Sequence, residues 1–410
     1  MKEYVIVGNG VASIGCIEGI RSVDKDGKIT VISEEKHHIY GRPLISYYLE
    51  HKTDLERMKY RPDDYYEVNN CRVIYGKRVE AVDNKAISVT LDDKTVIKAD
   101  SICIATGSRP FVPPFEGLET VKNKFSFMTL DDALSLEKAL DKNAKVLIVG
   151  AGLIGLKCAE GIRDRVGSIT VCDLADRVLS SILDNDCAAT VEAHLKKEGI
   201  DFMLGDTAVR FDNNKAFMKS GAEVDFDILV LAVGVRANTE LLSDIGGNVN
   251  RGVIVNEKME TNLKGIHAAG DCAEGFDASI GANRVLAILP NAYMQGHTAG
   301  TNMAGGSAIF DNAIPENSIG FFGLHIMTAG AYDGEMTEEK GENSLKRFFV
   351  KDGRLSGFIL IGDIDRAGIY TSLIRNKTPL NEIDFELTKK VASSFIFSEK
   401  TRRKNFGGVV

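Results

Sequence analysis

The 410-residue sequence has only seven cysteines, and no two of them form a CxxC pair. A zinc site or a disulfide scaffold is therefore not expected, and reduced, buried thiols are the simpler interpretation. No uninterrupted apolar run approaches the ~20 residues that a membrane helix needs. Basic charge is not in excess either, because 50 Lys and Arg face 58 Asp and Glu. The net charge of −8 argues against a general role in binding nucleic acid or anionic membranes.

Apolar residues make up 44% of the chain and charged residues 26%, which is ordinary globular usage. The length suits two or three domains of ~100–200 residues each. The first expected strand covers residues 3–7, which leaves no room for a signal peptide ahead of it. We therefore expect a multidomain protein of the cytoplasm.

Two segments of the chain have the same order of elements. The first reads YVIVGNGVASIG over residues 4–15, and the second reads KVLIVGAGLIG over residues 145–155. Each predicts a strand, a glycine turn, a helix and a second strand that ends in an acid. That acid is Glu34, with Glu35 beside it, in the first copy and Asp173 in the second. This is the βαβ dinucleotide-binding pattern in its full context.

The glycines of these motifs have specific physical tasks. The first glycine of each copy permits a tight turn, and the second lets the backbone approach a pyrophosphate. The helix that follows offers free N–H groups and the positive end of its dipole to that anion. The first copy departs from the pattern at its third glycine, where Ser13 stands. Because that glycine serves helix–strand packing, we expect a looser fit there and no loss of phosphate binding.

The remaining chain predicts further strands and a change of composition near residue 314. Strands are expected in the stretches 72–83, 86–91, 100–105, 225–234 and 265–268, and a helix over 291–304. From 314 onward the pattern becomes short alternating strands, such as 347–350 and 355–361, followed by helical segments. We interpret this last part as a separate α+β domain.

Taken together, these motifs resemble the pyridine nucleotide–disulfide oxidoreductase superfamily over residues 1–310. The motifs are GNG at 8–10, ATG at 105–107, GAGLIG at 150–155 and AAGD at 268–271. Residues 40–44 and 363–370 look most like the NADH:rubredoxin oxidoreductase and nitrite-reductase-like branch. The resemblance implies an α/β architecture with two Rossmann-like three-layer ββα dinucleotide-binding domains and a small α+β C-terminal domain. It implies a discontinuous FAD-binding domain at 1–108 and 240–310, an NAD-binding domain at 109–239, and an interface or partner-docking domain at 315–410.

The resemblance also implies two sets of cofactor-binding residues. For FAD they are Gly8, Gly10, Val11, Ala12, Glu34, Glu35, Arg42, Val79, Ala105, Thr106, Gly107, Asp271 and Asn291, the last at the start of a helix aimed at the flavin. For NAD(H) they are Gly150, Gly152, Leu153, Ile154, Gly155, Asp173 and Gly234. A carboxylate at 173 accepts hydrogen bonds from a ribose 2′-hydroxyl and repels a 2′-phosphate, which favours NADH over NADPH.

The thiol relay of many superfamily members is missing. Cys16 has no partner at CxxxxC spacing because position 21 is Arg. Tyr40 stands before Gly41-Arg42-Pro43, where the peroxidase and CoA-disulfide branch resembles Cys-Gly-x-Pro. We therefore expect no thiol nucleophile, and we assign no catalytic acid or base and no metal ligand. Electrons are expected to leave the flavin directly.

The resulting hypothesis is an FAD-dependent oxidoreductase that transfers hydride between NAD(H) and flavin. Single electrons would then pass to or from an iron carrier, either rubredoxin or a ferredoxin-like iron–sulfur protein. One alternative is an FAD/NAD subunit of a larger complex that receives electrons from an iron–sulfur subunit of another catalytic enzyme. A further alternative is an NADH-sensing interaction flavoprotein. The sequence leaves open whether the chain forms a homo-oligomer or belongs to a complex.

The charge of the C-terminal segment bears on the partner. Residues 315–410 carry 14 Lys and Arg against 13 Asp and Glu, whereas the rest of the chain carries 36 against 45. Positive charge gathers at Lys400, Arg402, Arg403 and Lys404. Such a patch would attract a small acidic iron carrier and raise its rate of association.

Overall fold

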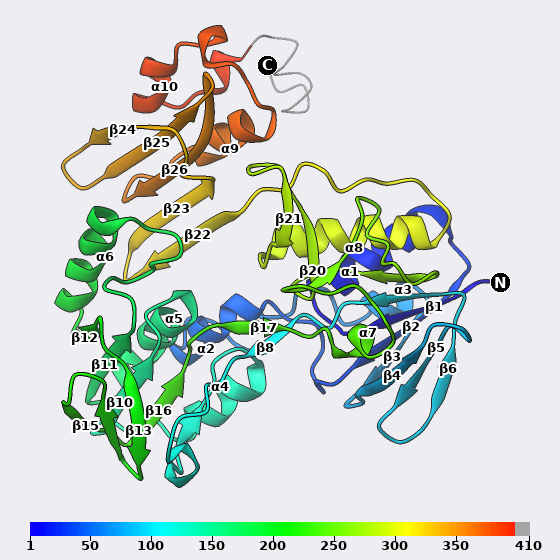
Figure 1. Ribbon diagram of the computed structural model, residues 1–410, viewed down its shortest axis with the longest axis horizontal. Coiled ribbons are helices and arrows are strands. Elements are labelled where there is room, and N and C mark those ends of the chain that lie inside the picture. Colours follow the sequence, from blue (N-terminus) through cyan, green and yellow to red (C-terminus); the bar gives the residue numbers. More distant parts are fainter. Residues whose placement is uncertain (398–410) are drawn as a thin grey trace. The chain divides into compact units, whose positions relative to one another are not determined.

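The computed structural model describes residues 1–397, which form two compact units (Figure 1). The larger unit contains Met1–Gly275 and Ala292–Phe310, and the smaller contains Phe276–Asn291 and the chain from Asp311 onward. The predicted basic cluster at 400–404 lies outside the described residues. Within residues 1–397, none of the helices is both long enough and apolar enough to cross a membrane.

The first dinucleotide fold of the larger unit is built on a five-stranded parallel sheet in the order β19-β7-β1-β2-β3. Its strands are β1 (Glu3–Val7), β2 (Lys28–Ser33), β3 (Cys71–Tyr75), β7 (Ser101–Ile104) and β19 (Ile266–Ala268). Strand β7 is buried along its whole length, as expected for a parallel sheet covered on both faces. Helix α1 (Val11–Val23) follows β1. An antiparallel sheet of β4 (Val79–Asp83), β5 (Ser88–Leu91) and β6 (Val96–Lys98) completes this first dinucleotide fold.

The second dinucleotide fold repeats the plan with parallel strands in the order β12-β11-β10-β16-β9. Its strands are β9 (Lys124–Phe125), β10 (Lys145–Val149), β11 (Ser168–Asp173), β12 (Ile200–Leu204) and β16 (Ile228–Leu231). Its helices are α4 (Leu130–Glu137), α5 (Leu153–Ile162) and α6 (Asn185–Lys197). The antiparallel strands are β13 (Ala208–Asp212), β14 (Lys215–Met218) and β15 (Glu223–Asp225). The predicted fold class is thereby confirmed.

Two short strands connect the two dinucleotide folds. Strand β8 (Ser108–Pro110) leaves the first fold and pairs in antiparallel fashion with the returning strand β17 (Val235–Ala237). Arg109 lies opposite Arg236 in this pairing. The second fold is therefore an insertion into the first, with its entry and exit strands held side by side.

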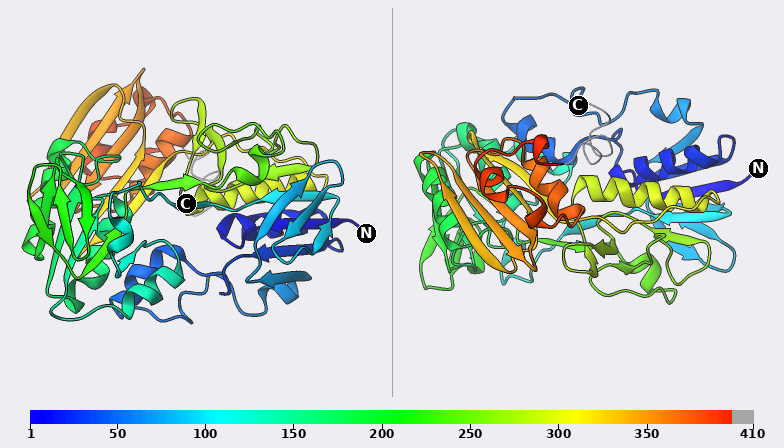
Figure 2. Two further views of the ribbon diagram at one scale, coloured as in Figure 1. Left: turned by 60° about the horizontal axis from the view of Figure 1, so that its bottom comes forward. Right: turned by 90° about the horizontal axis from the view of Figure 1, so that it is seen from above.

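Four glycines bring helix α1 against helix α8 (Leu289–Met303) at backbone distance. A Cβ at Gly15 or Gly19 would overlap the α8 backbone at Tyr293 or His297. A Cβ at Gly296 or Gly300 would overlap the carbonyl oxygens of α1. The contacts advance in the same direction along both helices, so α1 and α8 run parallel, and Figure 2 shows them side by side. The two helices consequently present their N-termini at the same end.

The smaller unit is an α+β domain, as the sequence predicts. Its antiparallel sheet has the order β22-β23-β26-β25-β24. The elements are β22 (Glu316–Phe321), β23 (Leu324–Gly330), β24 (Glu335–Lys340), β25 (Leu345–Lys351), β26 (Arg354–Ile361), α9 (Ala367–Arg375) and α10 (Phe385–Lys390). Phe348, Phe358 and Tyr370 form the centre of its core, with Phe348 and Tyr370 ring centroids 4.9 Å apart.

The other short elements connect these sheets. They are α2 (Ile45–Leu49), α3 (Tyr65–Val68), α7 (Glu240–Ser243), β18 (Val253–Ile254), β20 (Ala273–Asp277) and β21 (Ala282–Val285). Helix α2 packs against α5, which brings the first and second dinucleotide folds into contact.

A buried histidine on β19 predicts acid sensitivity. Burial lowers the pKa of His267 to about 4, while Glu260 opposes that shift. Because the unfolded chain then binds more protons than the folded chain below pH ~6.5, this contribution to stability is complete above pH 6.5 and is lost as the pH falls toward 4. The full loss is about 3 kcal/mol. We expect His267→Gln to unfold less steeply with acid than the native chain in urea melts between pH 7 and 4.

The matched control for that prediction is His51→Asn, because His51 is exposed and its positive φ of 59° suits asparagine. It should follow the native pH dependence. If H267Q and H51N lost stability equally steeply between pH 7 and 4, the assignment of acid sensitivity to His267 would be contradicted.

Candidate functional site

The first glycine loop has the geometry of a phosphate-binding turn. Gly8 has φ of +112°, and a Cβ there would overlap the carbonyl oxygen of Ala105. Gly10 caps the N-terminus of α1, which starts with Val11 and Ala12. A Cβ added at Gly10 would have no neighbouring atom within 4 Å. That open side is what a pyrophosphate needs in order to reach the backbone N–H groups. Gly107, on the Ala105–Thr106–Gly107 turn, likewise has positive φ and an open side.

The second loop reproduces this geometry with Gly150 and Gly152. Gly150 has φ of +119° and lies against the carbonyl oxygen of Ala232, while Gly152 caps α5 with an open side. Helix α5 begins at Leu153 and Ile154. Gly234 also has positive φ and an open side. The residues present at both loops therefore fit a dinucleotide phosphate.

The third glycine position of the motif holds different residues in the two copies, Ser13 in the first and Gly155 in the second. A Cβ at Gly155 would overlap the carbonyl oxygen of Gly150. In the first copy, the Ser13 hydroxyl donates a hydrogen bond of 2.8 Å to the corresponding carbonyl oxygen of Gly8. Ser13 is fully buried. The expected looser fit is thus compensated by a hydrogen bond within the loop.

The two acidic residues at the strand ends have different surroundings. Glu34 is exposed at the end of β2. Asp173 is tied to its own glycine loop, because its Oδ2 accepts from the Ala151 N–H at 2.7 Å and its Oδ1 from the Ala175 N–H at 2.8 Å. The carboxylate is therefore held in one orientation beside the loop that would bind the cofactor.

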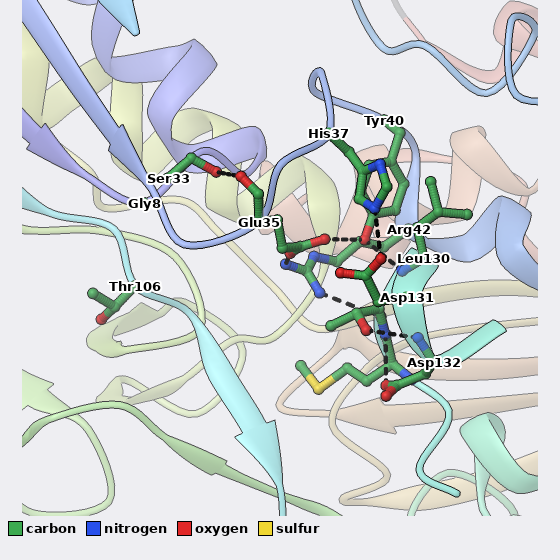
Figure 3. A network of polar contacts seen from close by, with 12 residues as sticks. Gly8, Ser33, Glu35, His37, Tyr40, Arg42, Thr106, Leu130, Asp131 and Asp132 are labelled. Atoms are coloured by element: carbon green, nitrogen blue, oxygen red, sulfur yellow. Dashed lines mark hydrogen bonds and ion pairs between the residues drawn. The ribbon is translucent and has the colours of Figure 1, made fainter. Parts of the chain in front are cut away.

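Arg42 is held in a network of polar contacts that the sequence did not indicate (Figure 3). One Glu35 oxygen pairs with the Arg42 guanidinium, and the other accepts a 2.7 Å hydrogen bond from the Tyr40 hydroxyl. A second Arg42 nitrogen donates to the Met128 carbonyl oxygen at 3.3 Å. The structure thus directs the carboxylate of Glu35, a predicted cofactor ligand, toward Arg42.

The predicted ribityl ligand Asp271 lies close to the turn at residues 105–107. Burial raises the pKa of its carboxyl, while Arg42 and the Ser108 hydroxyl, 3.4 Å from Oδ2, lower it. Asn238 joins this turn to β17, donating through Nδ2 to the Thr106 carbonyl oxygen at 2.9 Å. The structure therefore places Arg42, Asp271 and Thr106 around one region of the first fold.

The remaining predicted positions are mostly backbone sites. Val79 begins β4, and Ala105 follows β7 directly, both buried. Asn291 lies in the first turn of α8, but its side chain is buried and donates to the Ile314 carbonyl oxygen at 3.1 Å. One turn later, Gln295 accepts from the Gly270 N–H at 2.7 Å, next to Asp271. Gln295 was missed by sequence reasoning, because its contact with Gly270 spans 25 residues and no local spacing indicates it.

The cysteine side chains are mostly buried, as the sequence leads us to expect. Six of the seven cysteines are buried, and Cys71 is partly buried. Burial raises the pKa of Cys272 to about 11 and that of Cys172 to about 12. Over residues 1–397, no group of three or more His, Cys, Asp or Glu side chains is arranged to hold a metal ion.

A lysine lies at the contact between α2 and α5. The Lys157 ammonium sits 4.6 Å from the centroid of the Tyr47 ring and pairs with buried Glu160. Gly161 follows, and a Cβ there would come within 2.9 Å of the Ser46 carbonyl oxygen. The absence of a side chain at Gly161 therefore allows the two folds to approach closely.

Comparison with known proteins identifies the family. Residues 2–296 match the pyridine nucleotide-disulphide oxidoreductase family, and residues 315–378 match the rubredoxin NAD+ reductase C-terminal domain. The chain therefore belongs to the pyridine nucleotide-disulphide oxidoreductase family, as the resemblance predicted. This family uses FAD and NAD(H), which agrees with the two open glycine loops.

Individual relatives cover nearly the whole chain. The epsilon subunit of NADH-dependent phenylglyoxylate dehydrogenase from Aromatoleum evansii is 29% identical over 395 residues, covering 93% of each chain. NADH-rubredoxin oxidoreductase from Clostridium acetobutylicum is 26% identical over 371 residues, covering 89% of this chain and 92% of the relative. The crystal structure of a covalent putidaredoxin reductase–putidaredoxin complex matches with a TM-score of 0.88 at 23% identity, covering 96% of this chain and 97% of that one. This last likeness shows the shared fold.

Proposed function

We propose that the chain is an FAD-dependent oxidoreductase that moves electrons between NADH and an iron carrier in the cytoplasm. The observation that carries the proposal is the pair of open glycine loops in one compact unit whose cysteines are buried or partly buried. When bound, FAD can exchange a hydride with NADH and single electrons with an iron centre, so no thiol relay is needed.

The first loop is the proposed FAD site and the second the proposed NADH site. Gly10 and the α1 N-terminus would hold the FAD pyrophosphate, with Arg42 on its phosphates, Glu34 on the adenosine ribose and Asp271 on the ribityl chain. Gly152 and Asp173 would hold NADH. Residues 1–108 with 240–310 would then be the FAD-binding domain and 109–239 the NAD-binding domain. Residues 315–410 would serve as the docking domain.

The chain's own residues contribute binding and orientation in this scheme. Two parallel helices, α1 and α8, offer their positive N-terminal ends at one side of the first fold, which favours negative charge there. Hydride transfer between two bound rings needs alignment more than it needs proton donors. We therefore assign no catalytic acid or base.

The acceptor is proposed to be rubredoxin or a ferredoxin-like iron–sulfur protein. The rubredoxin reductase C-terminal domain match over 315–378 and the 26% identical NADH-rubredoxin oxidoreductase support this choice. A second candidate function is that of an FAD/NAD subunit in a larger complex. It is favoured by the phenylglyoxylate dehydrogenase epsilon subunit, which matches over 93% of both chains.

Anaerobic stopped-flow absorbance tests both functions. Flavin-loaded protein is mixed with NADH or with NADPH, and rubredoxin or a ferredoxin is then added. Rapid bleaching by NADH, followed by recovery of colour with one carrier, is the expected result. Bleaching without recovery by either carrier, together with partner subunits in a native purification, would favour the complex. No bleaching by NADH would refute the proposed oxidoreductase.

A further inference from the structure

The hydroxyl of Tyr40 connects the two dinucleotide folds. It donates to Glu35 at 2.7 Å and accepts a 2.8 Å hydrogen bond from the backbone N–H of Leu130, the first residue of α4. Tyr40 belongs to the segment that follows β2 of the first fold, whereas α4 belongs to the second. Figure 3 shows this hydroxyl between Glu35 and the start of α4.

The same network determines the position of the Arg42 guanidinium. Glu35 pairs with one of its nitrogens, and the Met128 carbonyl oxygen accepts from another at 3.3 Å. The guanidinium carbon also lies 5.9 Å from the centroid of the Tyr40 ring. The side chain of Arg42 is 39% exposed, so it remains accessible to a ligand. Its orientation is fixed by Glu35 and by the Met128 carbonyl oxygen.

The burial of Tyr40 makes its hydroxyl a permanent donor. Only 7% of the residue is exposed, and burial raises the pKa of the phenol above its ordinary value. The proton therefore stays on the oxygen at physiological pH, and the hydroxyl can donate to Glu35. Removing the hydroxyl would leave a buried N–H of Leu130 and one oxygen of Glu35 without this partner.

We propose that Tyr40 is a positioning residue for Arg42. Through Glu35 it fixes the guanidinium that contacts the FAD phosphates, and through Leu130 it ties that guanidinium to the second dinucleotide fold. FAD affinity then depends on how the proposed NADH-binding fold is positioned against the first fold. The inference rests on the proposed placement of Arg42 at the FAD phosphates.

The chain offers a close control for a merely structural role. The Tyr48 hydroxyl donates to Glu137 at 2.9 Å, and Glu137 lies at the far end of the same helix α4. Tyr48→Phe thus removes another tyrosine–carboxylate hydrogen bond between the same two folds without touching Arg42. The two variants should lose stability in a similar way, but only Y40F should weaken FAD binding.

A double-mutant cycle with the full-length protein tests the proposal. FAD dissociation constants are measured by flavin fluorescence at several salt concentrations for the native chain, R42M, Y40F, R42M/Y40F and Y48F. We expect R42M to weaken FAD binding by about 10- to 100-fold and Y40F by up to about 10-fold. Y40F should also reduce the salt dependence of the dissociation constant, because it weakens a charge–phosphate contact. In the R42M background, Y40F should change FAD affinity by less than about 2-fold.

Each other outcome is informative. Equal effects of Y40F in the native and R42M backgrounds would overturn the positioning role, as would a comparable loss of FAD affinity in Y48F. If R42M leaves FAD affinity unchanged, the placement of Arg42 fails and this proposal fails with it. NADH-dependent bleaching would then still decide the oxidoreductase proposal independently. Should Y40F not fold, Glu35→Asp makes the same test, since it keeps the charge and withdraws the carboxylate from Tyr40 and Arg42.

Discussion

Replacing Gly300 with alanine is expected to destabilise the larger unit severely. The new Cβ would overlap the carbonyl oxygen of Cys16, and neither backbone can withdraw without separating α1 from α8. Overpacking of this kind costs about 3 kcal/mol or more, equivalent to a fall of roughly 6 °C in the melting temperature. We also expect G300A to lose FAD during purification, because α1 and α8 meet beside the first glycine loop. Differential scanning fluorimetry and the ratio of flavin to protein absorbance measure both effects.

The control is the same substitution where the structure leaves room. Gly368 lies in α9, and no atom lies within 4 Å of its Cβ direction. Since alanine is the better helix former, G368A should keep or raise stability by up to about 1 kcal/mol. A melting temperature of G300A equal to that of G368A would show that the helix contact is not tight.

Replacing Asp173 with asparagine is expected to remove most of the preference for NADH. Its carboxylate is fixed by the Ala151 and Ala175 N–H groups, so in the proposed NADH site it would present a defined charge to the ribose. Loss of that charge should lower kcat/KM for NADH by about 100-fold, since hydrogen bonds to charged groups are worth about 1.5–3 kcal/mol. The value for NADPH should change by less than about 3-fold, because the repulsion of a 2′-phosphate is removed together with the anchoring of the loop. Steady-state kinetics with both nucleotides measures the ratio.

Asp176→Asn serves as the control for charge alone. Asp176 is three residues away, is 74% exposed and pairs with Arg177. D176N should retain the native ratio of NADH to NADPH activity. A collapse of that ratio in D176N, or an unchanged ratio in D173N, would contradict the role given to Asp173.

The parts of the fold that repeat a local rule could be predicted from sequence. Gly8, Gly10, Gly150 and Gly152 each have the backbone conformation or the open side that the motif requires. The apolar runs before them form parallel strands, as their composition indicates. These features depend on neighbours within a few residues, and the local sequence therefore predicts them.

Features that depend on distant contacts could not be predicted in the same way. The bond of Tyr40 to Leu130 spans 90 residues. Gln295 reaches Gly270 across 25 residues. No local spacing rule encodes such pairs, because they arise only when the strands and helices have been assembled.

The insertion of the second dinucleotide fold also governs the order in which the chain can fold during synthesis. The sheet edge at β7 needs β19, and α1 needs the glycines of α8, but both partners follow the inserted segment. At about 5–20 residues per second, roughly 8–30 s separate the emergence of β7 from that of β19. During that interval the second fold can close, because all its strands lie between Lys124 and Leu231. The fold proposed to bind FAD is therefore the last to be completed during synthesis, because its apolar edge at β7 cannot pair until β19 has been made.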